Sequence, residues 1–253
     1  MSNEEIAEKL DNAAFNATAI PQVSQSNPIE LSAAYEIQKY SLQRRYNRGE
    51  KKVGIKMGFT SKAKMEQMGV HDLIWGRLTD GMFYKLGSDL RRDKFIHPRA
   101  EPEIAFKLAE DITDPVTLDT VKSYVSHVAI AIEIIDSRYE NFKFSLEDVV
   151  ADNCSSAAFT LGEWMPVTVG IENILMSLVR DDIIEKKGNS NAILGNPWES
   201  LVAAVRLSLE NKEPLSKNDI VLAGAATPAI YIKPGDTISA HAEGLGSVYL
   251  DII

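Results

Sequence analysis

The stretch 128–135 is apolar except for one glutamate, Glu133. Its length and its β-branched residues predict a strand in the protein interior. An unpaired carboxylate in such a strand costs several kcal/mol. The chain must therefore fold so that a cation lies next to Glu133, or so that a raised pKa keeps its carboxyl group neutral.

Short β-branched runs continue along the chain from Lys52 onward, separated by Gly, Asn, Asp and Pro residues. This pattern is typical of strands joined by turns. One helix is expected among them, because apolar residues recur at helical spacing over 197–211, beginning at Pro197. The expected strands include 53–55, 125–135, 219–222, 229–232, 237–240 and 246–250.

The first fifty residues predict two helices instead. Ser2 and Glu5 have the spacing of a capping box, and apolar residues follow them at helical intervals. A second helix is expected to begin after Pro28 and to end at Gly49, with arginines near its C-terminal end.

These patterns predict an α+β fold in which a helical segment, residues 1–50, precedes a strand-rich body, residues 51–253. The chain has 253 residues. At roughly 150 residues per domain, this length suits one large domain with an accessory segment or two domains. We find no internal repeat and no low-complexity tract.

The charge balance excludes some kinds of partner. The chain carries 27 Lys and Arg residues against 36 Asp and Glu residues, a net charge of −9, which argues against nucleic acid and anionic membranes. A single cysteine, Cys154, cannot form an internal disulfide and fits a reducing compartment. The N-terminus lacks the features of a signal peptide, and no apolar run is long enough to span a membrane. We therefore expect a cytoplasmic protein.

Two further glutamates, Glu101 and Glu103, stand two residues apart in a stretch that predicts a strand, so both side chains point to one face. Together with Glu133 they form a candidate site for Mg²⁺ or Mn²⁺, because hard divalent cations prefer carboxylate oxygens. Two alternatives remain open at this point: a solvated strand, on which Glu-x-Glu is common, and a buried pair between Glu133 and a lysine.

Lys56 is a cation within the short apolar run 53–59, which ends in a turn that contains Thr60 and Ser61. Such a turn can offer N–H groups and hydroxyls to a carboxylate. Lys56 is a candidate to stabilise an enolate or to move a proton. The alternative is a lysine that extends its charge to solvent.

The four histidines show no metal-ligand spacing, and neither a nucleophile motif nor a nucleotide-binding loop is present. Cys154 lies in a turn-like stretch and is interpreted as a small packing residue. Its neighbours Asn153, Ser155 and Ser156 are candidate ligand contacts.

Taken in order, these segments resemble the fumarylacetoacetate hydrolase superfamily, within the branch of hydratases and decarboxylases that act on 2-oxo acids. The resemblance runs from the N-terminal helices nearly to the end of the chain. Several blocks together make it far more specific than any single motif. The matching segments are 54–70, 101–103, 133–138, 151–156, 222–225, 234–236 and 244–246.

The resemblance implies a mixed β-roll with an N-terminal helical segment, and a Mg²⁺ or Mn²⁺ ion held by Glu101, Glu103 and Glu133. It also places Lys56 in the same pocket. The turn at Thr60 and Ser61 and the stretch 153–156 would face a 2-oxo acid. Members of the family usually form homo-oligomers.

Two segments resemble decarboxylases rather than hydratases: the stretch 137–144, and 56–58 together with 63–65. Hydratases also typically carry Pro-Asp-aromatic-Gly where this chain has residues 73–76, so Ile74 stands in place of an acidic group that helps to add water. Asp72 is close to Ile74 in the sequence, and it is the candidate acid if the alternative activity, a 2-oxopent-4-enoate hydratase, is correct.

The expected reaction is metal-dependent decarboxylation of the small dicarboxylic acid 2-oxo-3-hexenedioate to 2-hydroxypenta-2,4-dienoate and CO₂, in the meta-cleavage degradation of aromatic compounds. An acylpyruvate hydrolase and a catalytically idle metal-binding scaffold are further alternatives. A complex with a companion hydratase is a further expectation, because such a partner would receive the unstable dienol directly.

Overall fold

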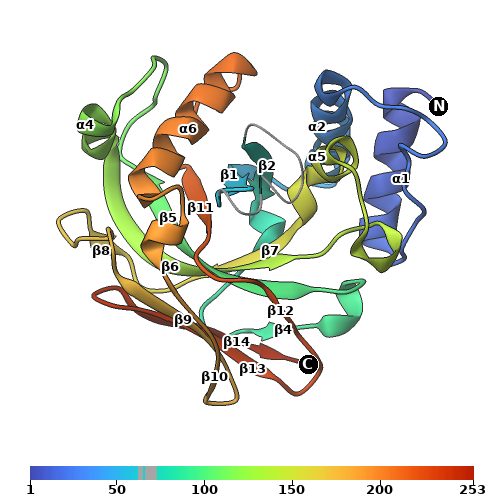
Figure 1. Cartoon of the computed structure of the whole chain (residues 1–253). Coiled ribbons are helices and arrows are strands. Elements are labelled where there is room, and N and C mark those ends of the chain that lie inside the picture. Colours follow the sequence, from blue (N-terminus) through green and yellow to red (C-terminus); the bar gives the residue numbers. More distant parts are fainter. Residues whose placement is uncertain (62–64, 66–72) are drawn as a thin grey trace.

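The computed structural model describes residues 1–61, 65 and 73–253 (Figure 1). The two predicted N-terminal helices are α1 (Asn3–Phe15) and α2 (Leu31–Asn47). The capping box is confirmed, because the Ser2 hydroxyl accepts a hydrogen bond from the Glu5 N–H and the Glu5 carboxylate bonds the Ser2 N–H.

In the described part of the chain, nine strands form the larger sheet, which mixes parallel and antiparallel pairs. Its main path runs β2-β1-β11-β5-β6-β7-β3, while β12 pairs with β5 and β8 pairs with β6. The strands are β1 (Lys52–Gly58), β2 (Ile74–Thr79), β3 (Phe83–Tyr84), β5 (Arg99–Leu108), β6 (Val125–Ile135), β7 (Ser156–Leu161), β8 (Met165–Pro166), β11 (Ile220–Ala225) and β12 (Ile230–Tyr231).

A second sheet packs beneath the first, with the order β10-β9-β13-β14-β4 (Figure 1). Its strands are β4 (Asp89–Leu90), β9 (Leu175–Arg180), β10 (Ile183–Asn189), β13 (Thr237–Ala242) and β14 (Gly246–Ile252). Apolar side chains from both sheets form the main core, including Ile130 of β6 with Leu178 and Val248 of the second sheet.

Helices cover the larger sheet at two places (Figure 1). The predicted helix α6 (Pro197–Glu210) is capped by Asn196 and packs near α4 (Leu118–Val121). Helix α5 (Leu146–Ala151) packs against α2. Short 3-10 helices are η1 (Asp80–Met82), η2 (Arg92–Lys94), η3 (Lys122–Tyr124), η4 (Glu140–Phe142), η5 (Asn153–Ser155) and η6 (Ser190–Ala192).

The predicted mixed β-roll with an N-terminal helical segment is confirmed. The division at residue 50 stays a prediction. Helix α2 is tied to the strand-rich body by Gln38, whose buried amide donates to the carbonyls of Trp75 and Val150 at 3.2 and 2.8 Å. None of the described helices combines the length and the hydropathy needed to cross a membrane.

The side chains of β5 and β6 alternate between the two faces of the larger sheet, and this alternation places the candidate metal ligands on one face. Residues with even numbers, such as Ile104 and Ile130, enter the core between the sheets. Residues with odd numbers point to the opposite face, and the three glutamates of the candidate metal site all belong to this set.

Candidate active site

Three buried glutamates, Glu101, Glu103 and Glu133, meet on one face of the larger sheet. Glu101 pairs directly with Glu133 across β5 and β6, while Glu103 lies two residues further along β5. One carboxylate oxygen from each residue lies within 4.8 Å of the others. Ala131 stands opposite Glu103, and its small side chain leaves this space open. We call these three glutamates the carboxylate triad.

Lys56 of β1 reaches the same point. Its Nζ lies 2.9 Å from Glu133 Oε2 and donates to the Cys154 carbonyl at 3.2 Å. Burial alone would lower the pKa of Lys56, but the charges of Glu133 and Glu103 outweigh burial and raise this pKa above its usual value. The two carboxylates therefore favour the ammonium form of Lys56.

The carboxylate triad holds more negative charge than Lys56 can balance. Burial and the charge of Glu133 raise the pKa of Glu103 well above its usual value, and burial also raises the pKa of Glu133. The charge of Lys56, at ion-pair distance from Glu133, opposes this rise but does not cancel it.

This donor set fits a divalent cation. Counting only the triad and Lys56, all in their ionised forms, three carboxylates against one ammonium leave two excess negative charges. Mg²⁺ and Mn²⁺ prefer oxygen ligands of this kind and keep further positions for water or substrate. Glu101, Glu103 and Glu133 are the residues that could hold such an ion.

Gly224 of β11 allows a close approach of the backbone to the carboxylate triad. Its N–H donates to Glu103 Oε2 at 2.8 Å. Its φ is +103°, and a Cβ at this position would lie 2.1 Å from Thr60 Oγ1. Both the left-handed conformation and the lack of space therefore require glycine here.

The turn 153–155 lies beside Lys56 in an unusual conformation. All three residues have positive φ, between 52 and 58°, which costs non-glycine residues roughly 1 to 2 kcal/mol each. The buried guanidinium of Arg138 binds both the carboxylate and the carbonyl of Asp152, the residue before the turn. The turn in this conformation directs the Cys154 carbonyl at Lys56.

A cavity of about 620 Å³ is lined by Glu101 of the carboxylate triad and by Lys56. Among the described residues, the Ser155 hydroxyl is buried without a hydrogen-bond partner. It is therefore available to a ligand in this cavity. Apolar side chains form much of the remaining wall. The predicted site residues that line the cavity are Lys56, Thr60, Ile74, Glu101 and Ser155, and the apolar ones include Met57, Phe59, Ile135, Phe142, Phe144 and Val149.

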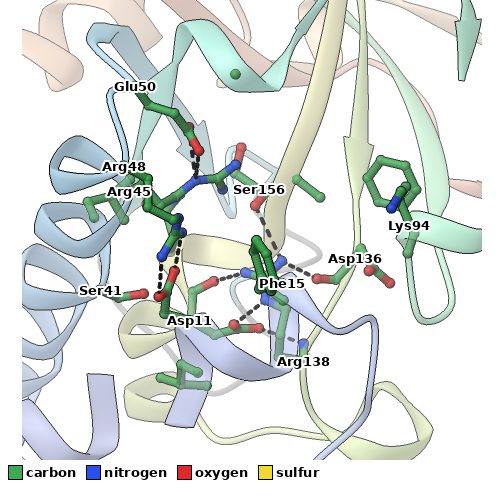
Figure 2. A pocket seen from close by; sticks show the side chains of 18 of the residues that line it. Asp11, Phe15, Ser41, Arg45, Arg48, Glu50, Lys94, Asp136, Arg138 and Ser156 are labelled. Atoms are coloured by element: carbon green, nitrogen blue, oxygen red, sulfur yellow. Dashed lines mark hydrogen bonds and ion pairs between the residues drawn. The ribbon is translucent and has the colours of Figure 1, made fainter. Parts of the chain in front are cut away.

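Two predicted substrate contacts, Asn153 and Ser156, line a different cavity of about 220 Å³ (Figure 2). The side chain of Asn153 accepts a hydrogen bond from the Arg77 N–H at 2.7 Å and donates to the Arg77 carbonyl at 2.9 Å. Asn153 thus holds the turn 153–155 against β2. The substrate contacts of Asn153 and Ser156 stay predictions.

The last two predicted site residues lie near the gap in the described chain. Ser61 follows Thr60, and its carbonyl accepts a hydrogen bond from the Met65 N–H at 3.0 Å. Asp72 lies outside the described residues. The roles predicted for both residues stay predictions.

Several charged side chains of the smaller cavity pair with one another (Figure 2). Arg48 donates to both oxygens of Asp11 at 2.6 and 2.7 Å, and Arg45 Nε lies 3.0 and 3.1 Å from the oxygens of Glu50. Their charges are already compensated. The cavity at the carboxylate triad is therefore the better candidate for chemistry.

Two further residues of the larger cavity, Arg99 and Phe142, are not among the predicted site residues. Arg99 is the first residue of β5, so it shares a face with Glu101 and Glu103. The alternation Arg-x-Glu-x-Glu was the sequence signal that could have revealed Arg99. Phe142 comes from η4, and only the folded chain brings it to this wall.

The fold and the site together define a class of mixed β-roll proteins with a buried carboxylate triad next to a lysine. The chain belongs to the fumarylacetoacetate hydrolase family, because its residues 62–252 match the family described as fumarylacetoacetate (FAA) hydrolase C-terminal.

Similar proteins include both decarboxylases and hydratases. The chain is 44% identical to a 4-oxalocrotonate decarboxylase of a Pseudomonas species, over 98% of this chain and 97% of that protein. It is 35% identical to a 2-keto-4-pentenoate hydratase of Burkholderia vietnamiensis, over 87% of this chain and 85% of that protein. The solved structure of 4-oxalocrotonate decarboxylase from Pseudomonas putida G7, complexed with magnesium and adipate, matches with a TM-score of 0.96, 34% identity and coverage of 99% and 97%.

Proposed function

We propose that this chain catalyses the metal-dependent decarboxylation of 2-oxo-3-hexenedioate to 2-hydroxypenta-2,4-dienoate and CO₂, in the meta-cleavage degradation of aromatic compounds. The observation that carries the proposal is the carboxylate triad with Lys56, next to a cavity that Lys56 and Glu101 line together with several apolar side chains. The 44% identity to a 4-oxalocrotonate decarboxylase supports the same reaction, since that name denotes the same substrate.

The substrate is the vinylogue of a β-keto acid. When the bond between C5 and C6 breaks, its electron pair forms the C4–C5 double bond, and the conjugated electrons move onto the C2 oxygen. A divalent cation held by the carboxylate triad would stabilise the negative charge on this oxygen. Protonation of the same oxygen then gives the dienol.

Lys56 supplies positive charge next to the developing enolate. Its Nζ is held between Glu133 and the Cys154 carbonyl, and its raised pKa favours the protonated form. We assign to Nζ either the stabilisation of the C2 oxygen or the transfer of a proton to it. Cys154 is not a nucleophile in this scheme, because burial raises the pKa of its thiol to about 12.

The apolar wall of the cavity favours loss of CO₂. Ile74 is 3% exposed and lines the cavity with Phe59 and Val149. Removal of water destabilises the leaving carboxylate more than it destabilises neutral CO₂. The described apolar side chains of this wall have no group that could activate a water molecule. Thr60, Ser61 and Ser155 are proposed to bind the 2-oxo acid end of the substrate.

A hydratase activity is the second candidate function, because the chain is also similar to a 2-keto-4-pentenoate hydratase. For that activity Asp72 would be the acid that helps to add water. We further propose a homo-oligomer and a complex with a companion hydratase, which would receive the unstable dienol. A cytoplasmic location stays a prediction.

One experiment separates the two reactions. The purified protein with Mg²⁺ is offered 2-oxo-3-hexenedioate and, separately, 2-hydroxypenta-2,4-dienoate, while CO₂ release and loss of the dienoate are followed. Decarboxylation predicts CO₂ from the dicarboxylate and a slow or absent reaction of the dienoate. Rapid conversion of the dienoate to 4-hydroxy-2-oxopentanoate without CO₂ release would establish the hydratase instead.

A further inference from the structure

We propose that Arg99 binds the distal carboxylate of the substrate and selects dicarboxylic over monocarboxylic 2-oxo acids. The inference rests on the proposed function, since it assumes that the 2-oxo acid end of the substrate lies at the carboxylate triad. Arg99 lines the same cavity as Lys56 and Glu101.

The position of Arg99 matches the length of the substrate. Arg99, Glu101 and Glu103 alternate along β5 and point to one face of the sheet. Arg99 and Glu101 are two residues apart, which corresponds to about 7 Å along a strand. An extended six-carbon dicarboxylic acid has a length comparable to this separation of the two backbone positions, which is consistent with one end at Glu101 and the other near Arg99.

The guanidinium of Arg99 is held rigidly but is not neutralised. It stacks between Phe142 and Tyr231, at 3.9 and 4.3 Å from the two ring centres. One N–H group donates to the Tyr231 hydroxyl at 2.5 Å, while the buried Nε has no hydrogen-bond partner in the described part of the chain. No described carboxylate forms an ion pair with Arg99 either. A planar donor that is fixed in this way suits a carboxylate.

Among the residues that the structure describes, the other cations that line the cavity are less suitable. Lys56 is already paired with Glu133. Lys143 also lines the cavity, but its residue is exposed to solvent, where an ion pair contributes little. The chain as a whole carries a net charge of −9, so a dianionic substrate needs a local positive charge at both ends.

Arg99 should act on binding more than on chemistry. A cation beside the distal carboxylate stabilises this group before it leaves, and this interaction weakens as the charge moves to the C2 oxygen. Loss of Arg99 is therefore expected to raise KM while kcat stays the same or increases.

The test compares the binding of two inert ligands to the Mg²⁺-loaded protein by calorimetry. 2-Oxoadipate has the length of the substrate but lacks the conjugated double bond, and 2-oxohexanoate lacks the distal carboxylate. The native chain should prefer 2-oxoadipate by about 10- to 100-fold, the range of a charge-assisted hydrogen-bonded pair. The variant Arg99→Gln should lose this preference and keep its affinity for 2-oxohexanoate.

The variant Lys143→Gln is the matched control, since Lys143 is another cation among the described residues that line the cavity. A preference that survives in Arg99→Gln, or one that disappears in Lys143→Gln, would overturn the assignment. If Arg99→Gln does not fold, Arg99→Lys is measured instead. This variant keeps the charge but loses the planar donor, so its preference for 2-oxoadipate over 2-oxohexanoate should be smaller than that of the native chain. Failure of both ligands to bind the native chain would instead count against the proposed function, whereas equal binding of both refutes only the role of Arg99.

Discussion

Lys56 and Glu133 are each unfavourable in a protein interior, and each makes the burial of the other possible. The ammonium and the carboxylate lie 2.9 Å apart, and both residues are at most 4% exposed. A buried pair of this kind is weak evidence for stability, because desolvation offsets the attraction between its charges. Its position beside two further carboxylates indicates a role in chemistry.

The first prediction concerns Lys56 itself. Lys56→Met keeps the approximate length of the side chain and removes its charge, so kcat should fall by about 10²- to 10⁴-fold while Mg²⁺ still binds. Steady-state kinetics and calorimetry measure the two effects. Lys52→Met is the control, because Lys52 lies on the same strand and pairs with Asp219 instead. Near-normal turnover in folded Lys56→Met would show that Lys56 is only structural.

At the scale of elements, the turn 153–155 depends on a residue that lies outside the catalytic cavity. Arg138 binds Asp152 through its side chain and its N–H group, and it also donates to the Ser156 carbonyl at 3.3 Å. These bonds hold the two ends of a turn whose three residues have positive φ. The free energy needed for this conformation comes from the surrounding contacts.

Arg138→Lys tests this coupling. It keeps the charge beside Asp152 but loses the planar set of donors, so the turn should shift and displace the Cys154 carbonyl from Lys56. We expect kcat to fall by about 10²-fold, the usual result of a displacement near 1 Å at an active site. The melting temperature and Mg²⁺ affinity should change far less. Full turnover in this variant would show that the turn does not need Arg138.

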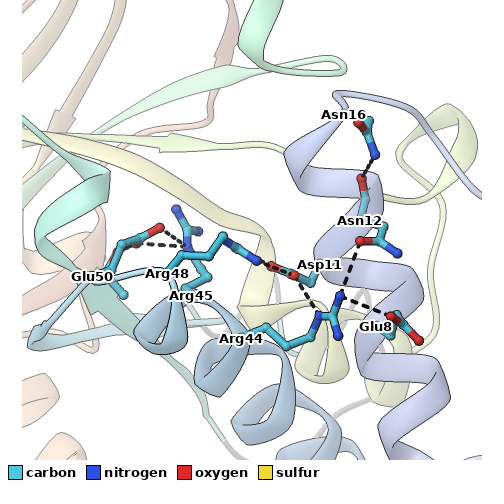
Figure 3. A network of polar contacts seen from close by, with 9 residues as sticks. Glu8, Asp11, Asn12, Asn16, Arg44, Arg45, Arg48 and Glu50 are labelled. Atoms are coloured by element: carbon cyan, nitrogen blue, oxygen red, sulfur yellow. Dashed lines mark hydrogen bonds and ion pairs between the residues drawn. The ribbon is translucent and has the colours of Figure 1, made fainter.

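A second element-scale contact joins α1 to α2 (Figure 3). Burial would raise the pKa of Asp11, but hydrogen bonds and charges from Arg48 and Arg44 outweigh burial and hold this pKa below its usual value. A lowered pKa in the folded state means that the contact stabilises the protein above the unfolded pKa of about 3.9 and is lost as the pH falls through the folded pKa.

Asp11→Asn should therefore lower the free energy of unfolding at pH 7 by about 1 to 2 kcal/mol, a range reduced because both arginines are partly exposed. The difference from the native chain should shrink below pH 4, which urea denaturation at several pH values can follow. Glu8→Gln is the control, because Glu8 pairs with Arg44 at an exposed position (Figure 3). A loss that is independent of pH would contradict the ionic origin of the contact.

At the scale of the whole molecule, the carboxylate triad links metal binding to stability. The charges of β5 and β6 repel one another in the centre of the larger sheet, so an ion that binds only the folded chain should stabilise all of it. Saturation at 100 times the dissociation constant adds about 2.7 kcal/mol. For a chain of this size, this corresponds to a rise of roughly 5 to 10 °C in Tm.

Differential scanning calorimetry, with a chelator and then with increasing Mg²⁺, measures this rise. Sodium chloride at the same ionic strength should not reproduce it. Glu133→Gln should lose both the rise in Tm and the turnover, because it removes one ligand and one charge of the triad. An equal rise in Glu133→Gln would locate the ion elsewhere.

The sequence alone determined the features that depend on local patterns. The capping box at Ser2 and the helix 197–211 follow from side-chain spacing within one or two turns, and the structure has both. The strand 125–135 follows from its β-branched residues. The shared face of Glu101 and Glu103 follows from the period of two along a strand.

Only the tertiary structure decided which distant residues meet. The pairing of Glu101 with Glu133 depends on the register between β5 and β6, and a shift of one residue would move Glu133 to the other face. Lys56 reaches the triad across β11, and Asn153 bonds to Arg77 although the sequence pattern suggested a ligand contact. Such contacts are set by the packing of segments far apart in the chain, where local periodicity carries no information about register or distance.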